Sequence, residues 1–382
     1  MKQHNGLSPS VSRRSLLALV ASGLAGCGGG GGLGGSLFAA LPGTGGTGLF
    51  AQGTIVGFGS VIVNGIRFDD TAAAVQVDGL AAGSQDLRLG MVADVQGLRG
   101  ADLTLGVANA IAVWSIAQGA VSQVQGGQFM VAGMLIETNA ATVFDGISGT
   151  AGLVHGMRVV VWGLQSGIDG SRWTATRVAL VTATSMVCTG IVTATGTLNG
   201  FALSGQSIAS LRSGQLVRVQ GALSSSGGSL QVDSFKLLGL QGSSLPQGEV
   251  EIEGLVTALL SGSRFMLGSV EVDASSASLA ASYKVLAIGQ RLEVEGIWQG
   301  GVLKAGSLGV ESEEKLDEAE IEAKIEQFTS LANFVVRGQR CDATSAVISE
   351  GVVSDLKVGV KVKLRGTKAG DVLMVTTLEI SD

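Results

Sequence analysis

The sequence predicts an all-β protein: a tandem array of about five small OB-like β-barrel repeats after a signal peptide and a Gly-rich tether. A Gly-x6-Gly segment, with apolar residues at the third and fifth positions after its first glycine, occurs five times, beginning at Gly90, Gly156, Gly214, Gly289 and Gly359. Glycine accounts for 60 of 382 residues and proline for only 3. Glycine supplies the positive φ angles of turns and bulges, so this balance favours short strands joined by tight turns. The absence of a Gly-x-y period excludes collagen, and the abundant Val, Leu and Ile argue against disorder.

Each copy of about 60–75 residues holds about five short strands. In the first copy a strand opens at Gly53, and an alternating apolar strand runs from Val61 to Gly65. The Gly-x6-Gly strand and a strand near Leu103–Leu105 follow. Five strands with one apolar face are best closed into a barrel, because closure removes exposed edges. An open sandwich that shares strands between neighbours is the alternative. Units this small bury a marginal core alone, so we expect neighbouring copies to lean on one another.

These patterns divide the chain into seven segments. The predicted boundaries are 1–26 for the signal peptide, 27–50 for the tether, and 51–116, 117–186, 187–246, 247–312 and 313–382 for repeats 1 to 5.

The alternation within the Gly-x6-Gly strands predicts which face is buried. The constant apolar face comprises Ala93/Val95, Val159/Val161, Val217/Val219, Leu292/Val294 and Val362/Leu364. Because side chains of a strand alternate between its two faces, these pairs point one way and are assigned to the core. The opposite face varies in charge and is expected to lie mostly in solvent.

Two acidic stretches carry the same period of two. Glu249–Glu253 and Glu320–Phe328 alternate charged and apolar residues, which predicts strands with solvated carboxylates. A helix across Glu313–Glu326 is the competing interpretation of the second stretch.

The N-terminus resembles a bacterial lipoprotein signal. An arginine pair, Arg13 and Arg14, precedes a short apolar run that ends in Leu24-Ala25-Gly26-Cys27. The run is too short to span a bilayer, which takes about 20 apolar residues. The small residues before Cys27 resemble a lipobox, which implies acylation of that cysteine; an ordinary signal peptide with a chance cysteine is the alternative. The arginine pair also resembles a twin-arginine export signal.

The repeated unit resembles the bacterial domain family DUF5666. The resemblance rests on the Gly-x-x-Val-x-Val-x-Gly strand, the Phe-x-Val-x-Gly strand and the Val-Asp step after it, and covers about residues 50–382. The segment Phe328–Gly338 matches most closely, whereas copies two and three lack the aspartate. The resemblance implies a β-barrel-like fold and an envelope location, and it carries over no catalytic residue.

Groups that carry chemistry are scarce. The mature chain has one histidine, His155, beside a turn, and its two remaining cysteines, Cys188 and Cys341, are expected to be buried free thiols. Counting therefore excludes a zinc site of several His or paired Cys, and no cofactor is expected.

Two sets of residues are candidate ligand contacts. Asp69, Asp273 and Asp342 recur at one position, and each is either part of a calcium or polar-ligand site or a turn-forming aspartate. Trp162 and Trp298 lie at the outer end of the repeat strand. Each is expected either to form an exposed platform for a ligand or to pack between adjacent copies.

The function expected from the sequence is binding or scaffolding at the cell envelope. The membrane partner would be reached through a lipid on Cys27, and an envelope protein or glycan would be the ligand. A non-enzymatic role is favoured because no catalytic constellation accompanies the repeats. The alternatives are a hydrolase that uses carboxylates of Glu249–Glu253 or Glu311–Glu326, and an OB-type nucleic-acid binder. A net charge of −6 and 4% aromatic residues oppose nucleic acid as a partner.

Overall fold

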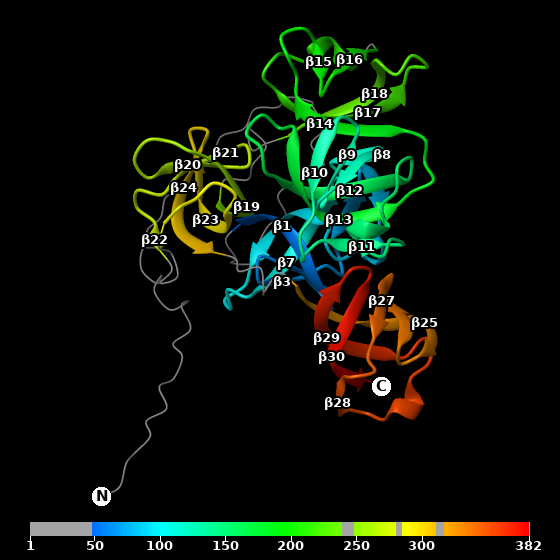
Figure 1. Cartoon of the computed structure of the whole chain (residues 1–382). Coiled ribbons are helices and arrows are strands. Elements are labelled where there is room, and N and C mark those ends of the chain that lie inside the picture. The colour runs from blue at the N-terminus through cyan, green and yellow to red at the C-terminus, as the bar shows by residue number, and fades with distance from the viewer. Residues whose placement is uncertain (1–47, 206, 239–247, 280–284, 311–316, 382) are drawn as a thin grey trace, which may run out of the picture. The chain divides into compact units, whose positions relative to one another are not determined.

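The computed structural model describes residues 48–205, 207–238, 248–279, 285–310 and 317–381 (Figure 1). The proposed signal peptide, most of the tether and Cys27 lie outside the described residues. Within them the chain forms strands, turns and four short 3-10 helices, with no α-helix. The all-β prediction is therefore confirmed.

The strands fall into five successive groups, called repeats 1 to 5 below. Repeat 1 comprises β1 (Gly48–Phe58), β2 (Val61–Val63), β3 (Ile66–Asp69), β4 (Ala74–Val77), β5 (Leu80–Ala82), β6 (Val92–Arg99) and β7 (Leu105–Val113). Repeat 2 comprises β8 (Ala117–Gln125), β9 (Gln128–Val131), β10 (Met134–Glu137), β11 (Val143–Asp145), β12 (Arg158–Gln165) and β13 (Arg172–Leu180). Repeat 3 comprises β14 (Met186–Ile191), β15 (Thr197–Leu198), β16 (Phe201–Ser204), β17 (Leu216–Leu223) and β18 (Ser229–Leu237).

Repeats 4 and 5 keep the same plan. Repeat 4 comprises β19 (Glu249–Leu259), β20 (Arg264–Leu267), β21 (Val270–Asp273), β22 (Ser278–Leu279), β23 (Arg291–Gln299) and β24 (Val302–Val310). Repeat 5 comprises β25 (Glu318–Ser330), β26 (Asn333–Val336), β27 (Gln339–Asp342), β28 (Val347–Glu350), β29 (Lys361–Ala369) and β30 (Val372–Ser381). The 3-10 helices are η1 (Ser84–Asp86), η2 (Thr150–Gly152), η3 (Ser207–Ser210) and η4 (Val353–Asp355).

Strand pairing closes these groups into barrels. In repeat 1, β1 pairs antiparallel with β2 and β6, β2 with β3, and β6 with β7, while β3 and β7 are parallel. With β6 and β7 counted as the fourth and fifth strands, the order is 1-2-3-5-4 and back to 1, which is the order of an OB barrel. Repeats 2, 4 and 5 close in the same way. The prediction of OB-like barrels is confirmed.

Repeat 3 is less completely closed. Among its described residues, no ladder joins its first strand, β14, to its second, β15. The gap is bridged instead by a side chain, because Asn199 Nδ2 donates to the carbonyl oxygen of Thr189 at 2.8 Å.

The two glycines of the Gly-x6-Gly segment serve different purposes. The first glycine adopts a positive φ in every copy, from 81° at Gly90 to 90° at Gly359. The last lies at a bulge, where the register between the fourth and fifth strands shifts. A Cβ at this position would meet a carbonyl oxygen of the fifth strand at 1.9 to 2.4 Å in all five copies. The motif is therefore a requirement of backbone geometry.

The barrel interiors contain the predicted apolar faces. Each of the ten residues assigned to the constant face of the Gly-x6-Gly strands is fully buried, which confirms that assignment. The prediction for the opposite face is wrong in part, because Trp162 is 5% exposed and Arg218 is 3% exposed. These side chains leave their own barrels and are buried against other repeats.

Strand β1 also joins repeat 1 to repeats 4 and 5. Its first half pairs in parallel with β19, from Leu49 opposite Glu249 to Gln52 opposite Ile252, and its end pairs in parallel with β25 through Gly57 and Phe58. The first half of β1 already has β6 on one side and the second half has β2, so each half leaves one edge free. An unpaired edge is unfavourable when buried, and β19 and β25 satisfy these two edges.

The expectation that sequence neighbours lean on one another is therefore only partly right. Repeats 2 and 3 do so through β8 and β14, and repeats 1 and 2 do so where Arg177 donates to the Leu89 carbonyl oxygen. Repeat 1 pairs with repeats 4 and 5, which lie far away in the sequence, because their first strands are the ones that fit its open edges.

The second acidic stretch forms a strand, as its alternation predicts. Strand β25 occupies Glu318–Ser330, so the competing helix across Glu313–Glu326 is wrong for the described part of that range. Residues 311–316 lie outside the described residues.

The bulge glycine gives a direct test of the fold in repeat 4. A Cβ at Gly296 would lie 2.1 Å from the carbonyl oxygen of Lys304, whereas a Cβ at Gly306 in the next strand would lie 3.7 Å from its nearest neighbour. We expect Gly296→Ala to lower the free energy of unfolding by about 2 kcal/mol or more, because the strand must shift to admit the methyl group. Urea unfolding followed by circular dichroism measures this loss. Gly306→Ala is the matched control, and an equal effect of both substitutions would contradict the explanation.

Candidate functional site: buried charges and exposed apolar segments between repeats

The three recurrent aspartates hold turns. Asp69 Oδ1 accepts hydrogen bonds from the backbone nitrogen of Thr71 at 3.0 Å and from its hydroxyl at 2.6 Å, and Asp342 does the same with Thr344 at 2.9 and 2.6 Å. These bonds lower the pKa of both carboxyls. Asp273 accepts from Lys304 Nζ at 2.7 Å and from the backbone nitrogen of Ser275, and these bonds also lower its pKa. The three carboxylates lie in separate barrels and do not converge.

The two candidate tryptophans present little aromatic surface. Trp162 is 5% exposed and belongs to a hydrophobic cluster built mainly from repeats 1 and 5, whereas Trp298 is half-buried against the core of repeat 4. The structure does not bring the two rings together in one cluster.

A tryptophan that the sequence did not single out lies among charges. The ring of Trp114 faces Lys236 Nζ at 3.8 Å and the Arg218 guanidinium at 5.5 Å, which are cation–π distances. Arg218 also pairs with Asp78 at 2.9 Å and donates to the Ser115 carbonyl oxygen at 2.6 Å. This cluster joins repeats 1 and 3, and its signal in the sequence was the charged face of the Gly-x6-Gly strand.

The remaining reactive residues are separate. His155 is exposed, and Cys188 and Cys341 are buried free thiols whose pKa burial raises to about 12. No three His, Cys, Asp or Glu side chains of the described residues are placed to hold a metal ion. Nor does any helix in the described ranges have the length and hydrophobicity to cross a bilayer.

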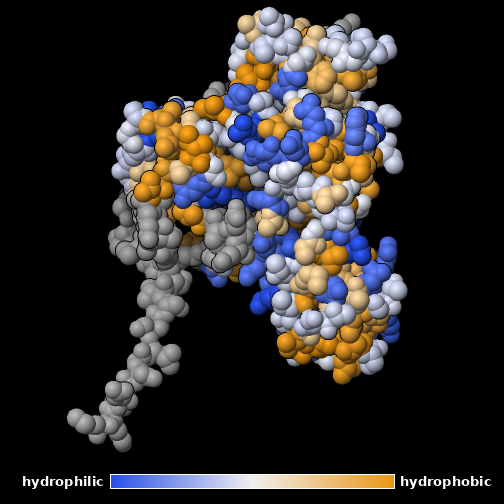
Figure 2. All heavy atoms as spheres, viewed as in Figure 1, coloured by the Kyte–Doolittle hydropathy of each residue, from blue (hydrophilic) through white to orange (hydrophobic). Residues whose placement is uncertain are grey.

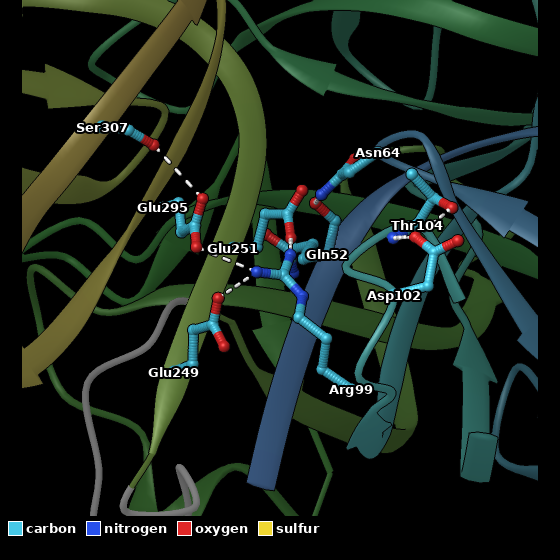
Figure 3. A network of polar contacts seen from close by, with 9 residues as sticks. All are labelled: Gln52, Asn64, Arg99, Asp102, Thr104, Glu249, Glu251, Glu295 and Ser307. Carbon is cyan, nitrogen blue, oxygen red and sulfur yellow. Dashed lines mark hydrogen bonds and ion pairs between the residues drawn. The ribbon is translucent and has the colours of Figure 1, made fainter. Parts of the chain in front are cut away.

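A buried charged cluster lies between repeats 1 and 4 (Figure 3). Arg99, at the end of β6, points its guanidinium at Glu249 and Glu251 of β19 and at Glu295 of β23, with 2.9 Å to Glu295 Oε1. Arg99 and Glu251 are nearly inaccessible, with side chains 7% and 2% exposed. Burial alone would lower the pKa of Arg99, but the three carboxylates outweigh it and raise that pKa.

Two of these carboxyls share a proton. Burial, followed by the hydrogen bond to Glu295, raises the pKa of Glu249 to about 8. The hydrogen bond from Glu249 lowers the pKa of Glu295, which also accepts from Ser307 Oγ at 3.2 Å. At neutral pH this pair of carboxyls therefore retains one proton, which Glu249 carries.

A second buried pair lies beside the first. Glu253 of β19 binds Arg291 of β23, and its other oxygen accepts from the backbone nitrogen of Thr54 in β1 at 2.6 Å. Arg291 in turn donates to Thr54 Oγ1 at 2.9 Å. The expectation that the carboxylates of Glu249–Glu253 are solvated is thus wrong for Glu251 and Glu253, because the parallel pairing of β1 and β19 buries them.

A small polar cavity adjoins this pair. It is lined by residues of four repeats, among them Thr54, Asn139, Thr176, Arg291 and Lys368. Burial, followed by the charge of Arg291, lowers the pKa of Lys368 to about 8. Thr176 Oγ1 is buried without a hydrogen-bond partner. Hydrogen-bond donors of Arg291, Lys368 and two threonines therefore line this cavity.

Exposed apolar side chains gather on the segments between the third and fourth barrel strands. In repeat 5 these are Val347 (68% exposed), Val352 (56%), Val353 (43%) and Val358 (60%), and in repeat 4 they are Val285 (75%) and Ile288 (64%). Figure 2 shows hydrophobic surface at the end of repeat 5 that carries β28. These residues could not be predicted from the sequence, because the sequence does not show whether a valine in a polar loop is covered by another repeat.

Comparison with known families identifies two of the repeats. The model of a domain of unknown function, DUF5666, matches residues 118–179 and 253–308, which lie within repeats 2 and 4. The match confirms the resemblance for these two segments, whereas the other three repeats, including the segment Phe328–Gly338, lie outside the matched residues.

The other comparisons add little. No curated protein matches the chain. Among solved structures, the chain is similar to Drosophila Unr CSD456, with 12% identity over 47% of this chain and 81% of that chain, at a TM-score of 0.15. A likeness this low supports no inference about ligands.

The Arg99 cluster gives a prediction about stability. In Arg99→Met the buried Glu251 loses its cation, so we expect the free energy of unfolding at pH 7 to fall by about 3–5 kcal/mol. Arg67→Met is the matched control: Arg67 also links repeat 1 to another repeat, through Glu320 at 2.8 Å, but it is 33% exposed. Its loss should cost at most about 1 kcal/mol. Urea unfolding compares the two, and equal losses would contradict the burial argument.

The shared proton gives a prediction about pH. Folded Glu249 keeps its proton up to about pH 8, whereas the unfolded carboxyl releases it near its ordinary pKa of 4.5. The folded chain therefore binds more protons between these values, and this group's stabilisation is lost as the pH rises through about 8. The lowered pKa of Glu295 acts only below its ordinary value of 4.5, outside this window.

We expect Glu249→Gln to flatten the decline in stability between pH 5 and 8, which this group steepens by at most about 1.4 kcal/mol per pH unit. Urea midpoints at pH 5, 6.5 and 8 measure the slope. Glu271→Gln, in the same repeat, should keep the wild-type slope. An unchanged slope in Glu249→Gln would show that the proton is not held there.

Proposed function

We propose that the chain is a lipid-anchored scaffold of the bacterial envelope that binds other proteins through its C-terminal repeats. The observation that supports binding is the set of exposed apolar side chains between the third and fourth strands of repeats 4 and 5. Exposed apolar residues that cluster are typical of protein-binding surfaces. The lipobox-like segment before Cys27 supports the anchor.

The alternatives have less support. An OB barrel binds oligonucleotides on its second and third strands, and it uses aromatic rings to stack the bases. The described second and third strands carry phenylalanines that point into the cores, such as Phe68, Phe129, Phe265 and Phe334, all at most 1% exposed. A carboxylate hydrolase would need an accessible pair, and Glu251 and Glu253 are buried in ion pairs.

The anchor is tested by acylation. Expressed in a bacterium supplied with an alkyne fatty acid, the wild-type chain should become labelled and should sediment with membranes. Cys27→Ser should abolish both, while Cys188→Ala, which alters a buried thiol, should leave labelling intact. Labelling that survives in Cys27→Ser would contradict the anchor.

Binding is tested on the same anchored chain by chemical cross-linking in intact cells. We expect Ile288→Asp, in repeat 4, to remove a specific cross-linked protein, because a charge at this apolar position opposes burial. Ile168→Asp is the control, since Ile168 is 52% exposed but lies in the turn between the last two strands of repeat 2. Identical cross-linking patterns in all three chains would count against a scaffold that binds through this segment.

A further inference from the structure

In repeat 1, the segment between the third and fourth strands is itself an interface. The segment Gly83–Gly90 contains η1, and the carbonyl oxygen of Ser84 accepts from Arg337 of repeat 5. The carbonyl oxygen of Leu89 accepts from Arg177 of repeat 2 at 3.0 Å, and the Leu89 side chain is 2% exposed. Two other repeats therefore bind repeat 1 at this segment.

The corresponding segment of repeat 5 has the same structure without such a covering. Helix η4 corresponds to η1, Leu356 is buried as Leu87 is, and Gly359 has the positive φ of Gly90. In this register Val358 occupies the position of Leu89 but is 60% exposed. Val352 and Val353 replace Gly83 and Ser84, so the uncovered segment is more apolar than the covered one.

Charged side chains flank these valines. Glu350, Asp355 and Lys357 are exposed, and none has an ion-pair partner among the residues that the structure describes. Along the chain, the segment thus intersperses exposed valines with unpaired charges of both signs. A surface of this kind is complementary to itself, because a two-fold axis can place Lys357 opposite Asp355 of the other copy.

We propose that the chain forms a symmetric dimer through the segment Val347–Val358 of repeat 5. This proposal rests on the proposed function, and it identifies one of the bound proteins as a second copy of this chain. The same segment in repeat 1 already binds repeats of this chain. An anionic lipid surface is the alternative partner of this segment, but the negative charges of Glu350 and Asp355 would be repelled by it. Four valines cover less than the about 800 Å² per partner of a standard interface, so the dimer is weak in solution. Anchoring in a membrane raises the effective concentration and favours it.

Sedimentation equilibrium of the full chain, carrying Cys27→Ser to exclude lipid, tests the dimer. We expect a monomer–dimer equilibrium, and we expect Val358→Asp to raise the dissociation constant at least tenfold. Ile288→Asp places the same charge on the corresponding segment of repeat 4 and should leave the constant within about twofold. A chain that is monomeric at every accessible concentration, or a dimer that Val358→Asp does not weaken, overturns the proposal.

The charges of Asp355 and Lys357 provide a second test, which distinguishes a dimer contact from a general loss of stability. Lys357→Glu should weaken the dimer several-fold, and the exchange of both charges, Asp355→Lys with Lys357→Asp, should restore it. Failure of the exchange to restore association overturns the two-fold arrangement.

Vesicles of phosphatidylethanolamine and phosphatidylglycerol distinguish the lipid surface. If the monomeric chain binds these vesicles and Val358→Asp abolishes that binding, the segment binds the bilayer, and the dimer is overturned. Failure of the dimer would leave acylation at Cys27 and the Ile288-dependent cross-link unaffected, so it is distinguishable from failure of the proposed function.

Discussion

The placement of repeats 4 and 5 against repeat 1 depends on the backbone hydrogen bonds along strand β1. This strand belongs to the barrel of repeat 1, and its two open edges also receive the first strands of repeats 4 and 5. The buried charges follow from this pairing. Glu251 and Glu253 become inaccessible only because β19 lies beside β1, and Arg99 and Arg291 are then required as counter-ions.

The repeated barrels could be predicted from the sequence because their constraints are local. A glycine that must adopt a positive φ, a second glycine that faces a carbonyl oxygen, and two apolar residues between them recur within eight positions. The alternation of Glu318–Ser330 likewise predicts a strand, and a strand is present. Each of these signals comes from a rule that acts within one or two neighbouring strands.

The contacts between repeats could not be predicted because no local rule identifies the partner. Glu251 and Glu322 have the same alternating environment in the sequence, yet Glu251 is 2% exposed beside Arg99 whereas Glu322 pairs with Lys361 near the surface. Trp162 and Trp298 both lie in the fourth strand of their barrels, but Trp162 is buried in a cluster with other repeats whereas Trp298 is half-buried against its own. Val358 of repeat 5 is exposed and its counterpart Leu89 of repeat 1 is buried, although each directly precedes the same glycine of the motif.

The two parallel pairings of β1 also affect how the chain reaches its final state. Leu49 comes to lie beside Glu249, so the strand synthesised first must wait for a partner that follows 200 residues later. Contacts between such distant segments form slowly, and an exposed strand edge invites pairing with the wrong chain in the meantime. Assembly of the first barrel with its partners is therefore a late step, completed only after the C-terminal third has emerged.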